Sequence, residues 1–120
     1  MGPKSIVGDK SLAFAKRIAR CYIFLKEQKK ETVMSKQLLR SGTSIGANVR
    51  EGQYAQSKKD FISKMSIALK EASETNYWLD VLHSVKYLSD EEYNSLNKDN
   101  DELLNLLASI VKTSKEKSNS

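Results

Sequence analysis

Apolar residues recur along the chain at spacings of three and four, which is the period of a helix that buries one face. The first stripe comprises Phe14, Ile18, Tyr22 and Leu25, and a charged connection of Lys26, Lys29, Lys30 and Glu31 follows it. The second stripe begins near Ser35 and comprises Leu38, Gly42, Ile45, Val49 and Gly52. The pattern predicts two helices joined by a short polar link.

Two further helices carry start signals. Ser57 with Asp60, and Ser89 with Glu92, match the S-x-x-[DE] motif, in which the serine side chain accepts a hydrogen bond from a backbone N–H. The third stripe comprises Phe61, Met65, Ala68, Ala72, Leu79 and Leu82. The fourth comprises Tyr93, Leu96, Leu103, Leu107 and Ile110, and Asn100 interrupts it. After Thr113 the sequence predicts a frayed or disordered tail.

Four helices with short links predict an all-α protein, an antiparallel up-and-down four-helix bundle. The 120 residues suit one domain, which we assign to residues 1–115, with a flexible tail at residues 116–120. Five Gly and one Pro argue against a turn-rich β-sandwich. Small residues are dense between Ser41 and Ala47, although each Gly costs a helix about 1 kcal/mol relative to Ala. Close approach of a neighbouring helix would explain them.

The third helix has a second apolar side. Ile67, Trp78, Val81 and Val85 fall within about 60° of one another, apart from the stripe that contains Phe61. A helix in a single bundle needs only one apolar stripe, so this second seam predicts self-association.

Glu71 and Glu74 lie in the second seam, where an unpaired buried charge would be strongly destabilising. Basic and amide side chains on the second helix are their candidate partners. The predicted subunit interface or buried polar network comprises Arg40, Asn48, Arg50, Glu71, Glu74, Trp78, Val81 and Val85. The alternative is that both glutamates simply point to water.

Charge is unevenly distributed along the chain. The net charge is +5, and residues 1–40 hold ten basic and three acidic residues, whereas residues 89–120 hold four and seven. A basic surface is typical of proteins that bind nucleic acid, because Lys and Arg displace counterions from phosphates. The predicted nucleic-acid-binding residues are Lys16, Arg17, Arg20, Lys26, Lys29, Lys30 and Lys36. The alternative is that these charges only solvate the helix and attract the acidic fourth helix.

Residues that resemble a catalytic site occur in an unsuitable setting. Gly42 to Gly46 matches G-x-S-x-G, and Asp80 and His83 follow, but a nucleophile elbow requires a parallel sheet. One Cys and one His cannot form a metal site of the paired Cys/His kind. We therefore expect no catalytic residue, metal, cofactor or small-molecule substrate. Cys21 alone favours a reducing, cytoplasmic setting, and no apolar run is long enough to predict a membrane span.

The stretch from Ser35 to Leu82 resembles the 23S rRNA-intervening sequence proteins, which are small bacterial four-helix bundles. The residues that carry the resemblance are Leu38 to Ser41, Ser44 to Asn48, Glu51, Ser57, Asp60, Phe61, Ala68, Glu71, Glu74 and Tyr77 to Leu79. The resemblance covers essentially the whole chain and implies an antiparallel bundle that assembles into a pentameric ring, with no catalytic residues assigned. A more distant similarity to accessory proteins of diversity-generating retroelements implies a basic ring that engages a reverse transcriptase and nucleic acid.

These observations favour a non-enzymatic, homo-oligomeric helical bundle that binds RNA, DNA or a nucleic-acid-handling protein through its basic face. The alternative is a structural or protein–protein adaptor whose charge sets only solubility and subunit docking. The expected partners are further copies of the chain and RNA or DNA, with no membrane. The dependence of binding on salt concentration separates the two interpretations.

Overall fold

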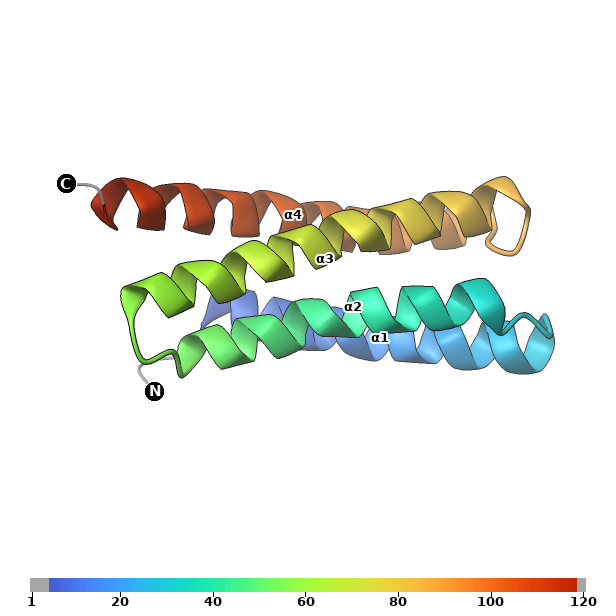
Figure 1. Cartoon of the computed structure of the whole chain (residues 1–120). Coiled ribbons are helices and arrows are strands. Elements are labelled where there is room, and N and C mark those ends of the chain that lie inside the picture. The colour runs from blue at the N-terminus through green and yellow to red at the C-terminus, as the bar shows by residue number, and fades with distance from the viewer. Residues whose placement is uncertain (1–4, 119–120) are drawn as a thin grey trace.

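The computed structural model describes residues 5–118, which form four helices and, within that range, no strand (Figure 1). They are α1 (Ile6–Gln28), α2 (Val33–Gln53), α3 (Lys58–Ser84) and α4 (Asp90–Ser118). Consecutive helices run back and forth along a bundle of 50 × 22 × 21 Å. The predicted all-α four-helix bundle is therefore confirmed. Both the α1–α2 link and the α3–α4 link lie at the same end of it.

The core is built from the predicted stripes, and every helix contributes to it. Its largest fully buried apolar side chains are Phe14, Ile18, Leu25, Leu38, Ile45, Val49, Met65, Leu79, Leu82, Leu103 and Leu107. Asn100, the polar interruption of the fourth stripe, is also fully buried. Its Nδ2 donates to the backbone carbonyl of Ala72 at 2.9 Å, so this polar residue ties α4 to α3 across the core.

Both predicted start signals cap helices. The Ser57 hydroxyl accepts from the backbone N–H of Asp60 at 3.0 Å, and α3 begins one residue after Ser57. Ser89 and Glu92 cap each other: Ser89 Oγ accepts from the N–H of Glu92, and Glu92 Oε1 accepts from the N–H of Ser89. This reciprocal pair satisfies two backbone donors that the helix itself leaves without partners.

The start of α2 differs from the sequence prediction, because Glu31 belongs to a helix cap rather than to a solvated link. Its two carboxylate oxygens accept from the N–H groups of Met34 at 2.8 Å and Ser35 at 2.9 Å, and the residue is only 6% exposed. Burial raises the pKa of Glu31, but these hydrogen bonds outweigh burial and hold the pKa below its ordinary value. The carboxylate therefore stabilises the helix start as a charged group.

The end of α4 also differs from the prediction. The helix continues beyond Thr113 to Ser118, so most of the segment expected to be a frayed tail is helical, and residues 119–120 lie outside the described range. Lys and Glu favour helix, and Lys115 and Lys117 lie in the last turn, where positive charge is favourable. No helix between residues 5 and 118 has the length and apolar character that crossing a membrane requires.

Candidate nucleic-acid and subunit interfaces

The predicted basic residues fall into two groups. Lys16, Arg20 and Lys36 are exposed along α1 and α2, while Lys26, Lys29 and Lys30 lie at the end of α1 and in the link that follows. None of these six residues forms an ion pair within residues 5–118, and Lys29 lies over the ring of Phe24, with 5.8 Å between Nζ and the ring centroid.

Arg17 has a different role from its neighbours. One guanidinium nitrogen lies 2.7 Å from Asp99 on α4, and the other donates to the hydroxyl of Ser95 at 2.9 Å. Lys10, which the sequence prediction did not include, pairs with Glu102 at 3.3 Å. The charges of these two residues attach α1 to the acidic α4.

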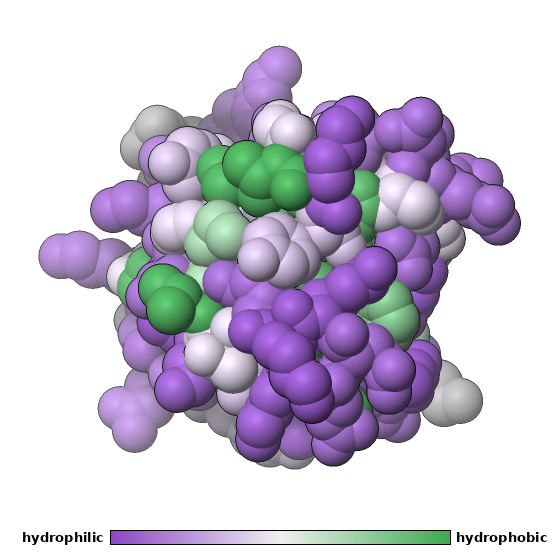
Figure 2. Space-filling view, turned by 90° about the vertical axis from the view of Figure 1, so that its right-hand side faces the viewer, coloured by the Kyte–Doolittle hydropathy of each residue, from purple (hydrophilic) through white to green (hydrophobic). Residues whose placement is uncertain are grey.

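The four lysines Lys26, Lys29, Lys30 and Lys86 lie where the two links meet, and we call them the basic end. Figure 2 views this end along the bundle and shows a broad hydrophilic area, with apolar residues gathered above it and to its left. Lys86 was missed from the sequence, although an up-and-down bundle places the α1–α2 and α3–α4 links at the same end. Lys30 and Lys86 both have positive φ, 57° and 75°, in these tight links.

Arg40 lies between the two glutamates of the second seam. Its guanidinium is 3.4 Å from Glu71 Oε1 and forms a second ion pair with Glu74. The Glu71 side chain is 18% exposed and that of Glu74 is 38% exposed, against 50% for Arg40. The hydrogen bond to Glu74 raises the pKa of Arg40 above its ordinary value. Arg40 thus pairs with both glutamates, and Glu71 Oε1 is left buried without a hydrogen bond.

The other two candidate partners are placed elsewhere, and the prediction that they approach Glu71 and Glu74 is wrong. Asn48 Nδ2 donates to the backbone carbonyl of Ser44 within α2, at 2.8 Å. Arg50 lines a groove on the α1 side of α2. A pair that the sequence prediction missed, Glu51 with Lys64 at 3.0 Å, joins α2 to α3 instead.

The second seam of α3 is partly open. Trp78 and Val81 are half-buried, whereas Ile67 and Val85 are 39% and 52% exposed. Tyr77 is exposed beside Trp78, with the rings edge to face and 5.0 Å between centroids. This seam leaves apolar area on the surface around the Arg40 ion pairs.

The residues that match the G-x-S-x-G motif and the Asp80 and His83 that follow it do not form a common site. The Ser44 hydroxyl donates to the carbonyl of Arg40 at 2.6 Å, as serines often do within helices. His83 instead contacts Asp90 at 2.6 Å and stacks on Tyr93, whose hydroxyl donates to Asp80. These bonds join α3 to α4. Among residues 5–118, no three His, Cys, Asp or Glu side chains cluster so as to hold a metal ion.

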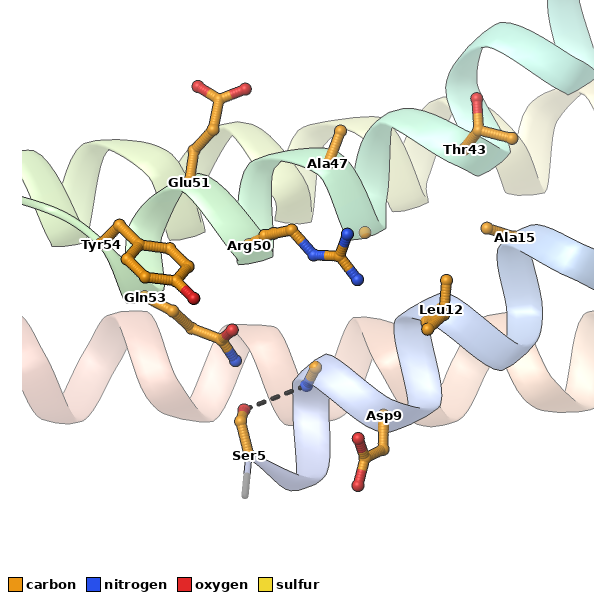
Figure 3. A pocket seen from close by; sticks show the side chains of 12 residues that line it. Ser5, Asp9, Leu12, Ala15, Thr43, Ala47, Arg50, Glu51, Gln53 and Tyr54 are labelled. Carbon is orange, nitrogen blue, oxygen red and sulfur yellow. Dashed lines mark hydrogen bonds between the residues drawn. The ribbon is translucent and has the colours of Figure 1, made fainter. Parts of the chain in front are cut away.

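A groove of about 670 Å³ opens between the first half of α1 and the last turns of α2 (Figure 3). Its lining includes Leu12 on α1, Ala47, Arg50 and Gln53 on α2, and Tyr54 directly after α2. The sequence prediction did not include this groove. The dense small residues of α2 are the one sequence feature that could have indicated this groove. Small side chains let α2 approach α1 closely at one point and leave space beside that contact.

Comparison with known proteins identifies the family. Residues 4–109 match the family described as 23S rRNA-intervening sequence protein. A crystal structure of a protein of unknown function from the S23 ribosomal protein family of Bacteroides thetaiotaomicron VPI-5482 has 58% sequence identity and a TM-score of 0.88, covering 89% of this chain and 99% of that chain. No curated protein matches the chain. Since the family match spans most of its length, the chain belongs to the 23S rRNA-intervening sequence protein family.

Proposed function

We propose that the protein is a non-enzymatic, homo-oligomeric bundle that binds nucleic acid through its basic end. The observation that supports this proposal is the set of unpaired lysines there: Lys26, Lys29, Lys30 and Lys86 form no ion pair within residues 5–118. Lys10 and Arg17, by contrast, are already paired to α4. Lysines that form no ion pair can turn their ammonium groups toward phosphates.

The chemistry of the basic end favours binding with little sequence preference. Lysine ammonium groups contact phosphates as point charges, and phosphate contacts position a nucleic acid without reading its bases. Phe24 is occupied by Lys29 at this end. We therefore expect similar affinity for unrelated sequences and a strong dependence on salt.

Self-association would multiply this modest surface. Ile67 and Val85 are partly exposed in the second seam of α3, and Val33 on α2 is 75% exposed. Burying such residues between copies removes apolar area from water. Several basic ends on one particle would then raise the apparent affinity for a long strand without a new type of contact. The resemblance read from the sequence implies a pentamer.

The test is neutralisation of two lysines of the basic end, Lys29→Gln with Lys30→Gln. The matched control is Lys112→Gln with Lys115→Gln, which removes the same charge from exposed positions near the end of α4. Binding of unrelated RNA and DNA fragments is measured at several salt concentrations. We expect the slope of log affinity against log salt to shrink by about 0.9 for each duplex phosphate that is no longer neutralised, in the basic-end variant only.

Two results would contradict the proposal. Equally weakened binding in both variants would mean that only net charge matters, and absence of binding by the unchanged protein would favour the adaptor interpretation. Self-association is tested separately by sedimentation of Ile67→Asp, with Ala108→Asp as a control at an exposed position on α4. A monomeric unchanged protein would overturn the oligomeric part.

A further inference from the structure

The groove between α1 and α2 has an apolar floor and a polar rim. Leu12 and Ala15 on α1 lie opposite Ala47 on α2, and Arg50, Gln53 and Tyr54 follow from the last turns of α2 (Figure 3). Its volume of about 670 Å³ falls in the range of sites that hold small organic molecules. The start of α1 and the end of α2, which contribute to the lining, lie at the opposite end of the bundle from the α1–α2 and α3–α4 links (Figure 1).

Arg50 supplies an uncompensated positive charge. Its guanidinium extends over the groove above Leu12 and forms no ion pair or hydrogen bond within residues 5–118. The two acidic residues of the lining are directed elsewhere: Glu51 pairs with Lys64, and Asp9 projects away from α2 in Figure 3. A free guanidinium binds phosphate oxygens through two parallel hydrogen bonds.

Gln53 supplies a donor that has no acceptor. Its Nε2 is buried and makes no hydrogen bond, and its amide points toward Ser5 and the start of α1 (Figure 3). Gly8 leaves space for it, since a Cβ at Gly8 would lie 2.6 Å from Nε2. This donor is enclosed against Gly8 at the start of α1, so a ligand in the groove does not reach it, and the polar ligand contacts are left to Arg50 and Tyr54.

Tyr54 supplies an aromatic face at the mouth of the groove. It follows the last residue of α2, is 67% exposed and makes no ring contact within the described residues. In Figure 3 the Tyr54 ring lies beside the Gln53 side chain, and the Arg50 side chain comes from the preceding turn of α2. Aromatic faces of this kind stack on nucleobases with little preference for which base.

The geometry points to a subsite for one nucleotide of a single-stranded nucleic acid, with the phosphate on Arg50 and the base on Tyr54. This inference rests on the proposed nucleic-acid binding and deepens it. A nucleotide combines a negatively charged phosphate, which Arg50 can bind, with a flat base, which can stack on Tyr54. A simple anion would use Arg50 and leave Tyr54 and the apolar floor bare.

The experiment is titration of the full chain with adenosine 5′-monophosphate, followed by the NMR signals of its backbone amides. Adenosine and inorganic phosphate are the comparison probes. We expect the monophosphate to shift signals from the lining of the groove, and each partial probe to bind about tenfold more weakly. Arg50→Gln and Tyr54→Ala should each weaken the monophosphate about tenfold, while Tyr54→Phe retains binding because the ring is kept.

Further results separate this subsite from the basic end. Lys29→Gln with Lys30→Gln should leave binding of the monophosphate unchanged, while weakening binding of long strands. Shifts confined to the basic end, or equal affinity in Tyr54→Ala and the unchanged protein, would overturn the subsite. If long strands bind no more tightly than the monophosphate, the proposed function fails while the nucleotide site stands.

Discussion

Gly42 marks a close approach of α2 to α1, and replacing it with alanine should destabilise the fold. A Cβ at this position would lie 2.8 Å and 2.9 Å from the two γ-carbons of Ile18 and 3.2 Å from its Cβ. Ile18 is completely buried, and the atoms in the way belong to its branched stem rather than to a flexible end. The methyl group therefore cannot be accommodated without moving a helix.

Two opposing terms set the magnitude. Alanine in place of glycine favours an α-helix by about 1 kcal/mol. An extra carbon in a packed core costs about 1–3 kcal/mol, and a clash with three atoms of one buried side chain lies at the upper end of that range. The net expectation for Gly42→Ala is a decrease of about 1–2 kcal/mol in the free energy of unfolding.

Gly46→Ala is the matched control, one turn further along α2. There the nearest atom to an added Cβ is the carbonyl oxygen of Ser11 at 3.3 Å, which requires only a small adjustment. The gain in helix propensity should offset that strain, so we expect stability within about 0.5 kcal/mol of the unchanged protein, or above it. Both variants are compared by urea denaturation at one fixed protein concentration, because association would make stability concentration-dependent.

A second background makes the test sharper. Ile18→Ala removes the γ-carbons that Gly42→Ala would meet, so on that background Gly42→Ala should raise stability through its helix propensity and by filling space. The change of sign is the diagnostic result. If Gly42→Ala is as stable as Gly46→Ala in the unchanged background, the close approach of α2 to Ile18 is not what requires glycine.

Two further predictions concern titrating groups. The pKa of Glu31 is lowered in the fold, so its carboxylate contributes stability above its ordinary value of 4.5 and loses that contribution as pH falls through the lowered value. Glu31→Gln should cost about 0.5–2 kcal/mol at neutral pH and progressively less as the pH falls below 4.5, as measured by denaturation over a series of pH values. Burial and the nearby Glu92 raise the pKa of Cys21 to about 11, from 9.0. Its thiol should react with a disulfide reagent at pH 8 about 100-fold more slowly than free cysteine, and an equal rate would contradict its burial.

The features that the sequence predicted well depend on neighbours along the chain. The reciprocal cap of Ser89 and Glu92 spans three residues, and the apolar stripes repeat within single turns of helix. Such signals need no knowledge of where other helices lie. The cap formed by Glu31 is equally local but was not predicted. Glu31 follows Lys29 and Lys30, and a run of charged residues is also what a solvent-exposed link between helices contains.

Contacts at the candidate site depend on how the helices are rotated against one another, which sequence patterns do not specify. Ten residues separate Arg40 from Arg50, which turns the second about 80° away from the first around α2. Arg40 therefore faces α3 and its glutamates, whereas Arg50 faces α1 and the groove. Arg17 is a similar case, because only the docked position of α4 brings Asp99 within 2.7 Å. Sequence patterns identify charges, but the rotation and register of each helix decide which charges meet.

Arg40 also offers a test of whether a second copy covers the seam of α3. In the free subunit Glu71 is 18% and Glu74 38% exposed, so water screens them and Arg40→Ala should cost about 1 kcal/mol. Covering the seam would remove that water, and a buried carboxylate without its partner costs about 3–5 kcal/mol. The difference of about 2–4 kcal/mol would weaken association by about thirtyfold or more. Lys64→Ala is the control, because its partner Glu51 is 59% exposed. Sedimentation over a range of concentrations should show Arg40→Ala dissociating and Lys64→Ala unchanged. Equal association of both variants would show that the ion pairs lie outside the contact between copies.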